Sequence, residues 1–206
     1  MTTSRTAPSG TGGVLVRPAT TDESAHVAWL AALTFPLACP PGTPVATMAA
    51  HVAAHLTPAD FAAWTVSDRH ALLVASADGG DGDDAPETPP ALLGYALVAF
   101  GEPEGAEERE VLRAVAGPGP YAELSKIYAH PHAWGTGVAT RLMTAAVDAA
   151  GRFAGPAGVP PLWLGTNGQN GRAQAFYRKH GFELAGTRTY DVGGVRHDDV
   201  VMLRHP

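Results

Sequence analysis

The stretch Trp134-Gly135-Thr136-Gly137-Val138-Ala139-Thr140 is the part of the sequence that indicates the fold most clearly. It lies between a run typical of a β-strand, residues 122–129, and a run typical of a helix that begins at Val138. Its two glycines and its alanine let the backbone approach a ligand closely. The first turn of a helix directs unpaired amide groups and the positive end of its dipole toward one point. The pattern therefore predicts a site for a phosphate or pyrophosphate group.

The spacing around this loop argues against two common nucleotide-binding motifs. The Lys-Ser/Thr pair of a Walker A motif is missing. The third glycine of a dinucleotide-binding fingerprint is missing as well, and no acidic residue follows about 20 positions later to bind a ribose. Taken alone, a Gly-x-Gly pair between a strand and a helix is as typical of a tight structural turn as of a ligand site.

A second constellation follows the predicted strand at residues 162–166. Asn170 is a suitable N-cap, and Gly181 is a suitable residue to end the helix that follows. Ala173, Phe176 and Tyr177 have the spacing of one helical face. These signals predict a short helix over residues 171–180.

Together these residues resemble the GCN5-related N-acetyltransferase (GNAT) superfamily. The resemblance rests on residues 123–131, on residues 134–139, and on the pattern Asn170-x-x-Ala173-x-x-Phe176-Tyr177-x-x-x-Gly181-Phe182. The family's loop reads Gln/Arg-x-x-Gly-x-Gly/Ala, and Trp134 stands where Gln or Arg is usual. This departure concerns one side-chain contact to the cofactor and leaves the backbone amides unchanged. Within the superfamily the chain most resembles the spermidine/spermine N-acetyltransferase branch, on residues 33–35, 40–41, 55–58, 163–165 and 191–199.

The resemblance implies an α/β (α+β) fold. Its centre is a mixed, mostly antiparallel sheet of six to seven strands, in which two parallel strands splay apart, and helices cover both faces. The alternation of strands and helices in the C-terminal half agrees with this architecture. We expect a disordered tail at residues 1–13 and one domain at 14–206, with flexible loops at 77–90 and 101–120.

Hydrophobic runs and helix-capping signals predict the individual elements. Asp22 is the expected cap of a first helix, Thr57 caps a helix that begins with Pro58, and residues 36–44 form a Pro-rich connection. We expect strands at residues 14–18, 71–76, 91–100, 122–129, 162–166, 182–190 and 197–203, helices at residues 23–35, 45–56, 138–153 and 171–180, and at most one helical turn between residues 106 and 115.

The resemblance also implies where acetyl-CoA, the expected co-substrate, binds. It would lie between the splayed strands at residues 122–129 and 162–166, and Asn170 would contact the pantetheine arm or the thioester. The backbone at Ile127 and Ala129 would pair with the arm, and amides from Ile127 through Tyr128 to Ala129 would stabilise the oxyanion. The pyrophosphate would bind the loop residues Gly135, Thr136, Gly137, Val138, Ala139 and Thr140.

Two residues are the candidate proton donors and acceptors. Tyr177 matches the family's tyrosine, which gives a proton to the departing CoA thiolate. Glu123 is the first candidate for the base that removes a proton from the acceptor ammonium, through a water molecule. Tyr128, His130 and His132 are weaker candidates for the base.

Composition limits the class of protein further. The net charge of −6 without a Lys/Arg block argues against nucleic acid. The only cysteine, Cys39, lies in a loop-like stretch, so no disulfide can form within the chain and a reducing compartment is expected. No secretory signal, no apolar run of membrane-spanning length and no metal-ligand spacing is visible, which indicates a cytoplasmic protein that needs no metal.

The expected activity is therefore acetyl transfer from acetyl-CoA to the primary amine of a small molecule such as a polyamine. The amine would attack directly, without a covalent enzyme intermediate. Two alternatives stay open: acetylation of a protein or peptide, and a non-catalytic CoA-binding sensor, to which Trp134 gives slight support. The resemblance also leaves a homodimer open, because many relatives pair.

Overall fold

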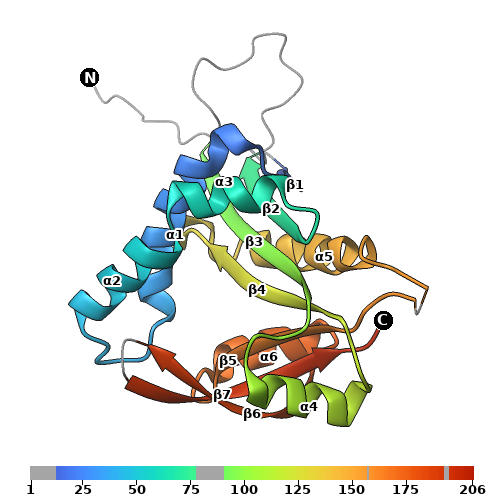
Figure 1. The fold of residues 1–206 in the computed structure, drawn as a ribbon. Coiled ribbons are helices and arrows are strands. Elements are labelled where there is room, and N and C mark those ends of the chain that lie inside the picture. Colours follow the sequence, from blue (N-terminus) through green and yellow to red (C-terminus); the bar gives the residue numbers. More distant parts are fainter. Residues whose placement is uncertain (1–12, 78–90, 157, 193–194) are drawn as a thin grey trace, which may run out of the picture.

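The computed structural model describes residues 13–77, 91–156, 158–192 and 195–206 (Figure 1). The predicted N-terminal tail lies outside this part of the chain up to residue 12. The loop predicted at 77–90 lies outside it from residue 78 onward.

One mixed sheet organises the described residues. Its strand order is β1-β2-β3-β4-β5-β7-β6, and only the neighbours β4 and β5 run parallel. This confirms the predicted fold class. The strands are β1 (Val14–Pro18), β2 (His70–Ala77), β3 (Leu92–Gly101), β4 (Tyr121–Ala129), β5 (Leu162–Asn167), β6 (Glu183–Val192) and β7 (Val195–Arg204).

Helices cover both faces of this sheet, as predicted. On one face α5 buries a stripe of apolar side chains, and α6 packs beside it. On the other face α1 and α3 share a second apolar cluster, and α4 covers a third. The helices are α1 (Ser24–Ala38), α2 (Val45–His55), α3 (Pro58–Val66), α4 (Ala106–Ala116), α5 (Val138–Gly151) and α6 (Gly171–Lys179), with short 3-10 turns η1 (Thr21–Glu23) and η2 (Pro131–Ala133).

Helix α1 differs from its prediction at both ends. Asp22 lies inside the turn η1, and the N-cap residue of α1 is Glu23. Thr20 caps the turn η1, where the Glu23 carboxylate accepts a hydrogen bond from the Thr20 amide at 2.9 Å. At the other end α1 continues past Pro36 to Ala38. A proline so near the C-terminus removes a single internal hydrogen bond, which the packing of α1 on the sheet offsets.

The prediction of a loop at residues 101–120 was wrong, because this segment contains the eleven-residue helix α4. Glu107 and Glu108 in its first turn and Arg113 in its last turn complement the helix dipole. Leu112 is fully buried in the third cluster, beside Tyr121 of β4. Burial against the rest of the fold therefore stabilises a helix in a segment whose acidic sequence had suggested a loop.

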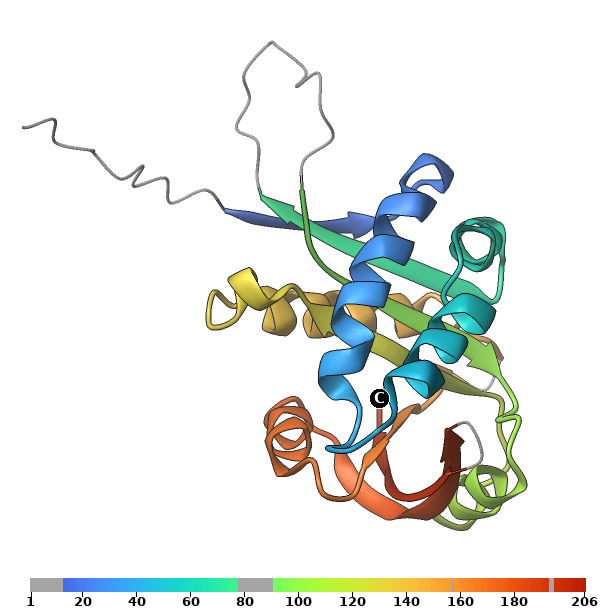
Figure 2. The same ribbon diagram turned by 90° about the vertical axis from the view of Figure 1, so that its left-hand side faces the viewer.

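The strands β4 and β5 separate soon after they begin. They pair only at Ala122–Leu162 and Glu123–Trp163, after which β4 follows β3 and β5 follows β7. One extra residue, Ser125, forms a bulge in β4 just beyond the last pair. Figure 2 shows α1 crossing in front of the sheet, where it packs against β3 and β4. The divergence leaves the facing edges of β4 and β5 without each other as partners.

Candidate active site

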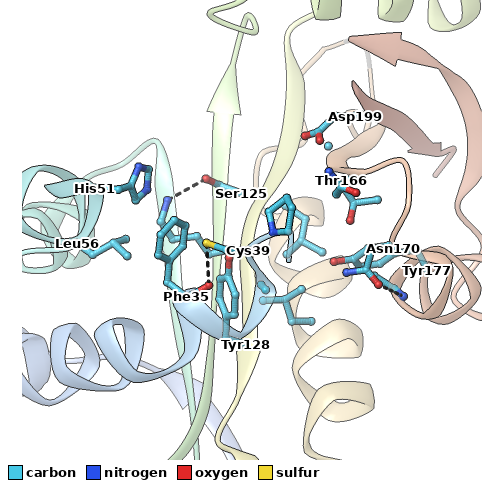
Figure 3. A pocket seen from close by; sticks show the side chains of 18 of the residues that line it. Phe35, Cys39, His51, Leu56, Ser125, Tyr128, Thr166, Asn170, Tyr177 and Asp199 are labelled. Atoms are coloured by element: carbon cyan, nitrogen blue, oxygen red, sulfur yellow. Dashed lines mark hydrogen bonds between the residues drawn. The ribbon is translucent and has the colours of Figure 1, made fainter. Parts of the chain in front are cut away.

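A cavity of about 320 Å³ lies where β4 and β5 diverge (Figure 3). Residues 124–128 of β4 and 165–167 of β5 line it from two sides. Further side chains come from α1 and α2 on one side and from α6, β6 and β7 on the other: Phe35, Cys39, His51, Leu56, Asn170, Tyr177, Arg188 and Asp199. Elements far apart in the sequence thus line one partly open cavity.

Tyr177 lines this cavity from α6. Its ring packs edge-on against Phe176 and Phe182, with ring centroids 5.6 and 6.0 Å away. Burial raises the pKa of the Tyr177 phenol to about 12, because the charged phenolate is poorly solvated there. The side chain therefore stays protonated at neutral pH and can serve as a proton donor.

Asn170 lines the same cavity and also caps α6, as its position predicted. Its Oδ1 accepts a hydrogen bond from the Ala173 amide at 3.0 Å. The cap fixes the side chain at the cavity wall and fixes the start of the helix that carries Tyr177. Asn170 is therefore held in place for contact with a ligand.

The backbone of the predicted Gly-x-Gly loop adopts a conformation that favours glycine. Gly135 and Gly137 have φ angles of +79° and +87°, a region that residues with side chains rarely adopt. Gly137 caps α5, and the first helical bond runs from the Arg141 amide to the Gly137 carbonyl at 3.0 Å. The amides of Val138, Ala139 and Thr140 consequently have no acceptor within the helix. Such a terminus can bind a phosphate group.

The loop's other side chains anchor it to the strand before it. The Trp134 indole donates to the Ala129 carbonyl at 3.1 Å, and the Arg172 guanidinium lies 5.5 Å from the ring centroid. The Thr136 hydroxyl donates to the Ala133 carbonyl at 2.7 Å. Trp134 thus positions the loop against the end of β4, where the family's usual Gln or Arg would contact the cofactor.

The β4 residues proposed for the cofactor divide into two groups. Ile127 and Tyr128 line the cavity, and the Tyr128 ring stacks on Tyr95 at 5.5 Å. Ala129 ends the strand and does not line the cavity. The weaker base candidates His130 and His132 also lie outside it, and His130 Nδ1 accepts the His132 amide within the turn η2.

Glu123 lies at the last pair between β4 and β5, next to the cavity but not among its lining residues. Burial raises the pKa of its carboxyl group, while the nearby charges of Arg188 and Lys126 oppose that shift. A water molecule would have to connect this carboxylate with an amine in the cavity. Its predicted role as the base thus remains a prediction.

Three charged cavity residues had no role in the sequence analysis: Lys126, Arg188 and Asp199. The Arg188 guanidinium contacts the Asp199 carboxylate at 3.5 Å and the Glu108 carboxylate at 2.7 Å. It crosses the strand β5 at Gly165, where an added Cβ would lie 2.2 Å from a guanidinium nitrogen. Only the insertion of β7 between β5 and β6 brings these residues together, so no short motif could have indicated them.

The described residues carry no group of three or more His, Cys, Asp or Glu side chains placed to hold a metal ion. Within the same ranges, no helix is both long and apolar enough to cross a membrane.

Comparison with known proteins agrees with this geometry. Residues 47–182 match the Acetyltransferase (GNAT) family. Uncharacterized N-acetyltransferases of Mycobacterium bovis and Mycobacterium tuberculosis are 37% identical to this chain over 179 residues. These alignments cover 87% of this chain and 95% of each relative.

Solved structures share the fold at low sequence identity. The PaiA N-acetyltransferase of Thermoplasma acidophilum, in complex with coenzyme A, has a TM-score of 0.66 and 15% identity, covering 94% of this chain and 99% of that chain. NAA60 of Arabidopsis thaliana, with a bisubstrate analogue, has a TM-score of 0.63 and 14% identity, covering 93% and 98%.

Proposed function

The chain belongs to the GNAT family of acetyltransferases and is an acetyl-CoA-dependent N-acetyltransferase, and from this premise we propose that its acceptor is the primary amine of a small molecule. The observation that carries the proposal is the cavity of about 320 Å³ that contains Tyr177. The end of α1 and the helix α2 close one side of it, through Phe35, Cys39 and His51. A chamber of this size suits a small amine.

The proposed reaction is one direct displacement. The amine nitrogen attacks the thioester carbonyl carbon, the new C–N bond forms, and the C–S bond breaks with its electron pair on sulfur. Tyr177 gives its proton to that sulfur, and the proton that the newly bonded nitrogen must lose restores the Tyr177 phenol. The pKa of the Tyr177 phenol, about 12, exceeds the ordinary thiol value of about 8.5, which disfavours this proton transfer. The same burial also raises the pKa of a CoA thiol formed beside Tyr177, which reduces the difference.

The second proton comes from the acceptor, which enters as an ammonium ion with a pKa near 10.4 if it resembles lysine. We assign its removal to Glu123 through a water molecule, because burial makes this carboxylate a stronger base than an exposed one. Amides of Ile127, Tyr128 and Ala129 would stabilise the oxyanion, and the amides at the start of α5 would bind the pyrophosphate.

A panel of acceptors tests the proposal. Purified protein with saturating acetyl-CoA is offered polyamines, aminoglycosides, amino acids and short peptides, and both free CoA thiol and the N-acetylated product are measured. We expect turnover on one class of small amines. Turnover on peptides alone would replace the proposal with protein acetylation. Binding of acetyl-CoA without turnover on any amine would favour a sensor.

A further inference from the structure

The acceptor cavity contains one cation whose charge no neighbouring carboxylate neutralises at contact distance. Two cationic side chains line it, Arg188 and Lys126. Arg188 is paired with both Glu108 and Asp199. Among the described residues, the ion pairs within 4.0 Å do not include Lys126. Lys126 is thus the cationic side chain of this cavity that no carboxylate contacts within 4.0 Å.

The surroundings of Lys126 hold its ammonium group at the cavity wall. Its Nζ lies 3.3 Å from the Ser125 hydroxyl, along a dashed line in Figure 3, and 4.9 Å from the centroid of the Trp64 ring. Burial lowers the pKa of Lys126 although Glu123 and Asp60 attract its charge. The charged form of Lys126 is therefore destabilised by poor solvation, and an anionic partner would offset this destabilisation.

The other charged groups around Lys126 do not supply that partner. The Asp60 carboxylate of α3 is held by the Thr57 amide at 2.9 Å and by its hydroxyl at 2.7 Å, and it forms no ion pair with Lys126 within 4.0 Å. Glu123 does not line the cavity. His51 of α2 and His70 of β2 also face Lys126, and burial with nearby positive charge lowers the pKa of both, which keeps them neutral.

We propose that the acceptor amine also carries a carboxylate and that Lys126 binds this carboxylate within the cavity. The inference rests on the proposed function and narrows it to amino acids and related amino-carboxylates. The carboxylate would accept hydrogen bonds from the Lys126 ammonium and from the Ser125 hydroxyl, while the amine lies toward Tyr177. A single unneutralised cation suits a monoanion better than a phosphate dianion.

The same charge disfavours the polyamine expected from the sequence. A polyamine bound with one amine near Tyr177 would bring a further ammonium group toward Lys126. Two like charges in a poorly solvated site repel one another strongly. Specificity for an amino-carboxylate would thus come from attraction of one end group and rejection of the other.

The test compares three matched series of acceptors. These are glycine with its longer ω-amino homologues, diamines of the same lengths, and the corresponding amino alcohols, each at saturating acetyl-CoA. Wild type is compared with Lys126→Met, which keeps the length of the side chain, and with Lys126→Arg, which keeps the charge. The chain's only other lysine, Lys179, is exposed on α6, so Lys179→Met is the matched control.

For wild type we expect the highest kcat/KM on an amino-carboxylate. Lys126→Met should raise KM for that acceptor by about 10- to 100-fold, as expected for the loss of a charged hydrogen bond. The loss on amino alcohols should be much smaller, because these acceptors carry no carboxylate for Lys126 to bind. A change in kcat common to all three series is expected as well, because the charge of Lys126 lowers the pKa of the base Glu123. Lys126→Arg should recover part of the loss, and Lys179→Met should behave like wild type. Acetyl-CoA affinity and melting temperature show that the variants remain folded.

Preference for diamines or amino alcohols in wild type would overturn the inference and leave the proposed function intact. An equal loss on all three series in Lys126→Met would also overturn it, because a general structural defect affects every acceptor. If no amine in any series is acetylated while acetyl-CoA binds, the proposed function itself fails and the inference falls with it.

Discussion

Burial acts on Tyr177 and Glu123 in the same direction, and each shift suits a different half of the reaction. A raised pKa keeps the Tyr177 proton in place until a thiolate forms beside it. A raised pKa makes the Glu123 carboxylate a stronger base toward an ammonium ion. Burial would therefore suit both side chains to the roles that we propose for them.

The base assignment predicts a change in the pH profile of kcat at saturating acceptor. The base must be ionised, and its pKa is raised, so the acidic limb should lie above the ordinary glutamate value of about 4.3. Glu123→Gln should lower kcat by about 10²- to 10³-fold and remove this limb. An unchanged limb in the variant would mean that another group takes the proton.

At the scale of elements, one ion pair connects the sheet edge to the start of α1. The Arg17 guanidinium on β1 contacts the Glu23 carboxylate of η1 at 2.6 Å. This hydrogen bond, with that of the Thr20 amide, lowers the pKa of Glu23 to about 2. The side chains of Arg17 and Glu23 are 32% and 14% exposed, so the pair is partly shielded from solvent and helps to orient the helix that covers the cavity.

Replacing Glu23 should therefore destabilise the fold in a pH-dependent way. The folded-state pKa is depressed, so the stabilisation is complete above about 4.5 and is lost as pH falls through about 2. Glu23→Gln should lower the unfolding free energy at neutral pH by about 1–2 kcal/mol, after allowance for solvent screening. Denaturant unfolding measures it, with the exposed Glu110→Gln as the control, expected within about 0.5 kcal/mol of wild type.

The turn before α5 offers a second test at this scale. Gly137→Ala would place a side chain at φ +87°, which costs roughly 1–2 kcal/mol, or would re-aim the amides that follow. We expect weaker binding of acetyl-CoA, by about fivefold or more, in titration calorimetry. Gly151→Ala, at the far end of the same helix and in open space, should leave affinity unchanged. Equal affinities in both variants would exclude this loop from the phosphate site.

At the scale of the whole molecule, local signals predicted the fold and the backbone elements to which we assign the cofactor. The cap at Asn170, the glycines of the loop and the strand at 122–129 are local features, and the structure has each of them. Helix α4 was missed because its stability comes from burying Leu112 against β4 and β5. Stabilisation by packing between distant segments is not visible in the sequence of the helix itself.

The acceptor side could not be predicted for a related reason. Lys126 was visible within a predicted strand, but the bulge at Ser125 decides which face of the sheet its side chain reaches. Arg188 and Asp199 meet at the cavity only because β7 inserts between β5 and β6. The charge of the cavity depends on the assembled sheet, so the sequence suggested a polyamine, whereas we propose an amino-carboxylate.

The most direct test of the central claim is a single turnover of protein loaded with acetyl-CoA and mixed with its acceptor amine. We predict equal amounts of N-acetylated amine and free CoA, with no acetylated protein at any time. We also predict a rate that falls about 10²- to 10⁴-fold in Tyr177→Phe at unchanged acetyl-CoA affinity. Accumulation of acetylated protein would contradict direct transfer, and an equal rate in Tyr177→Phe would contradict the role of Tyr177 as the proton donor.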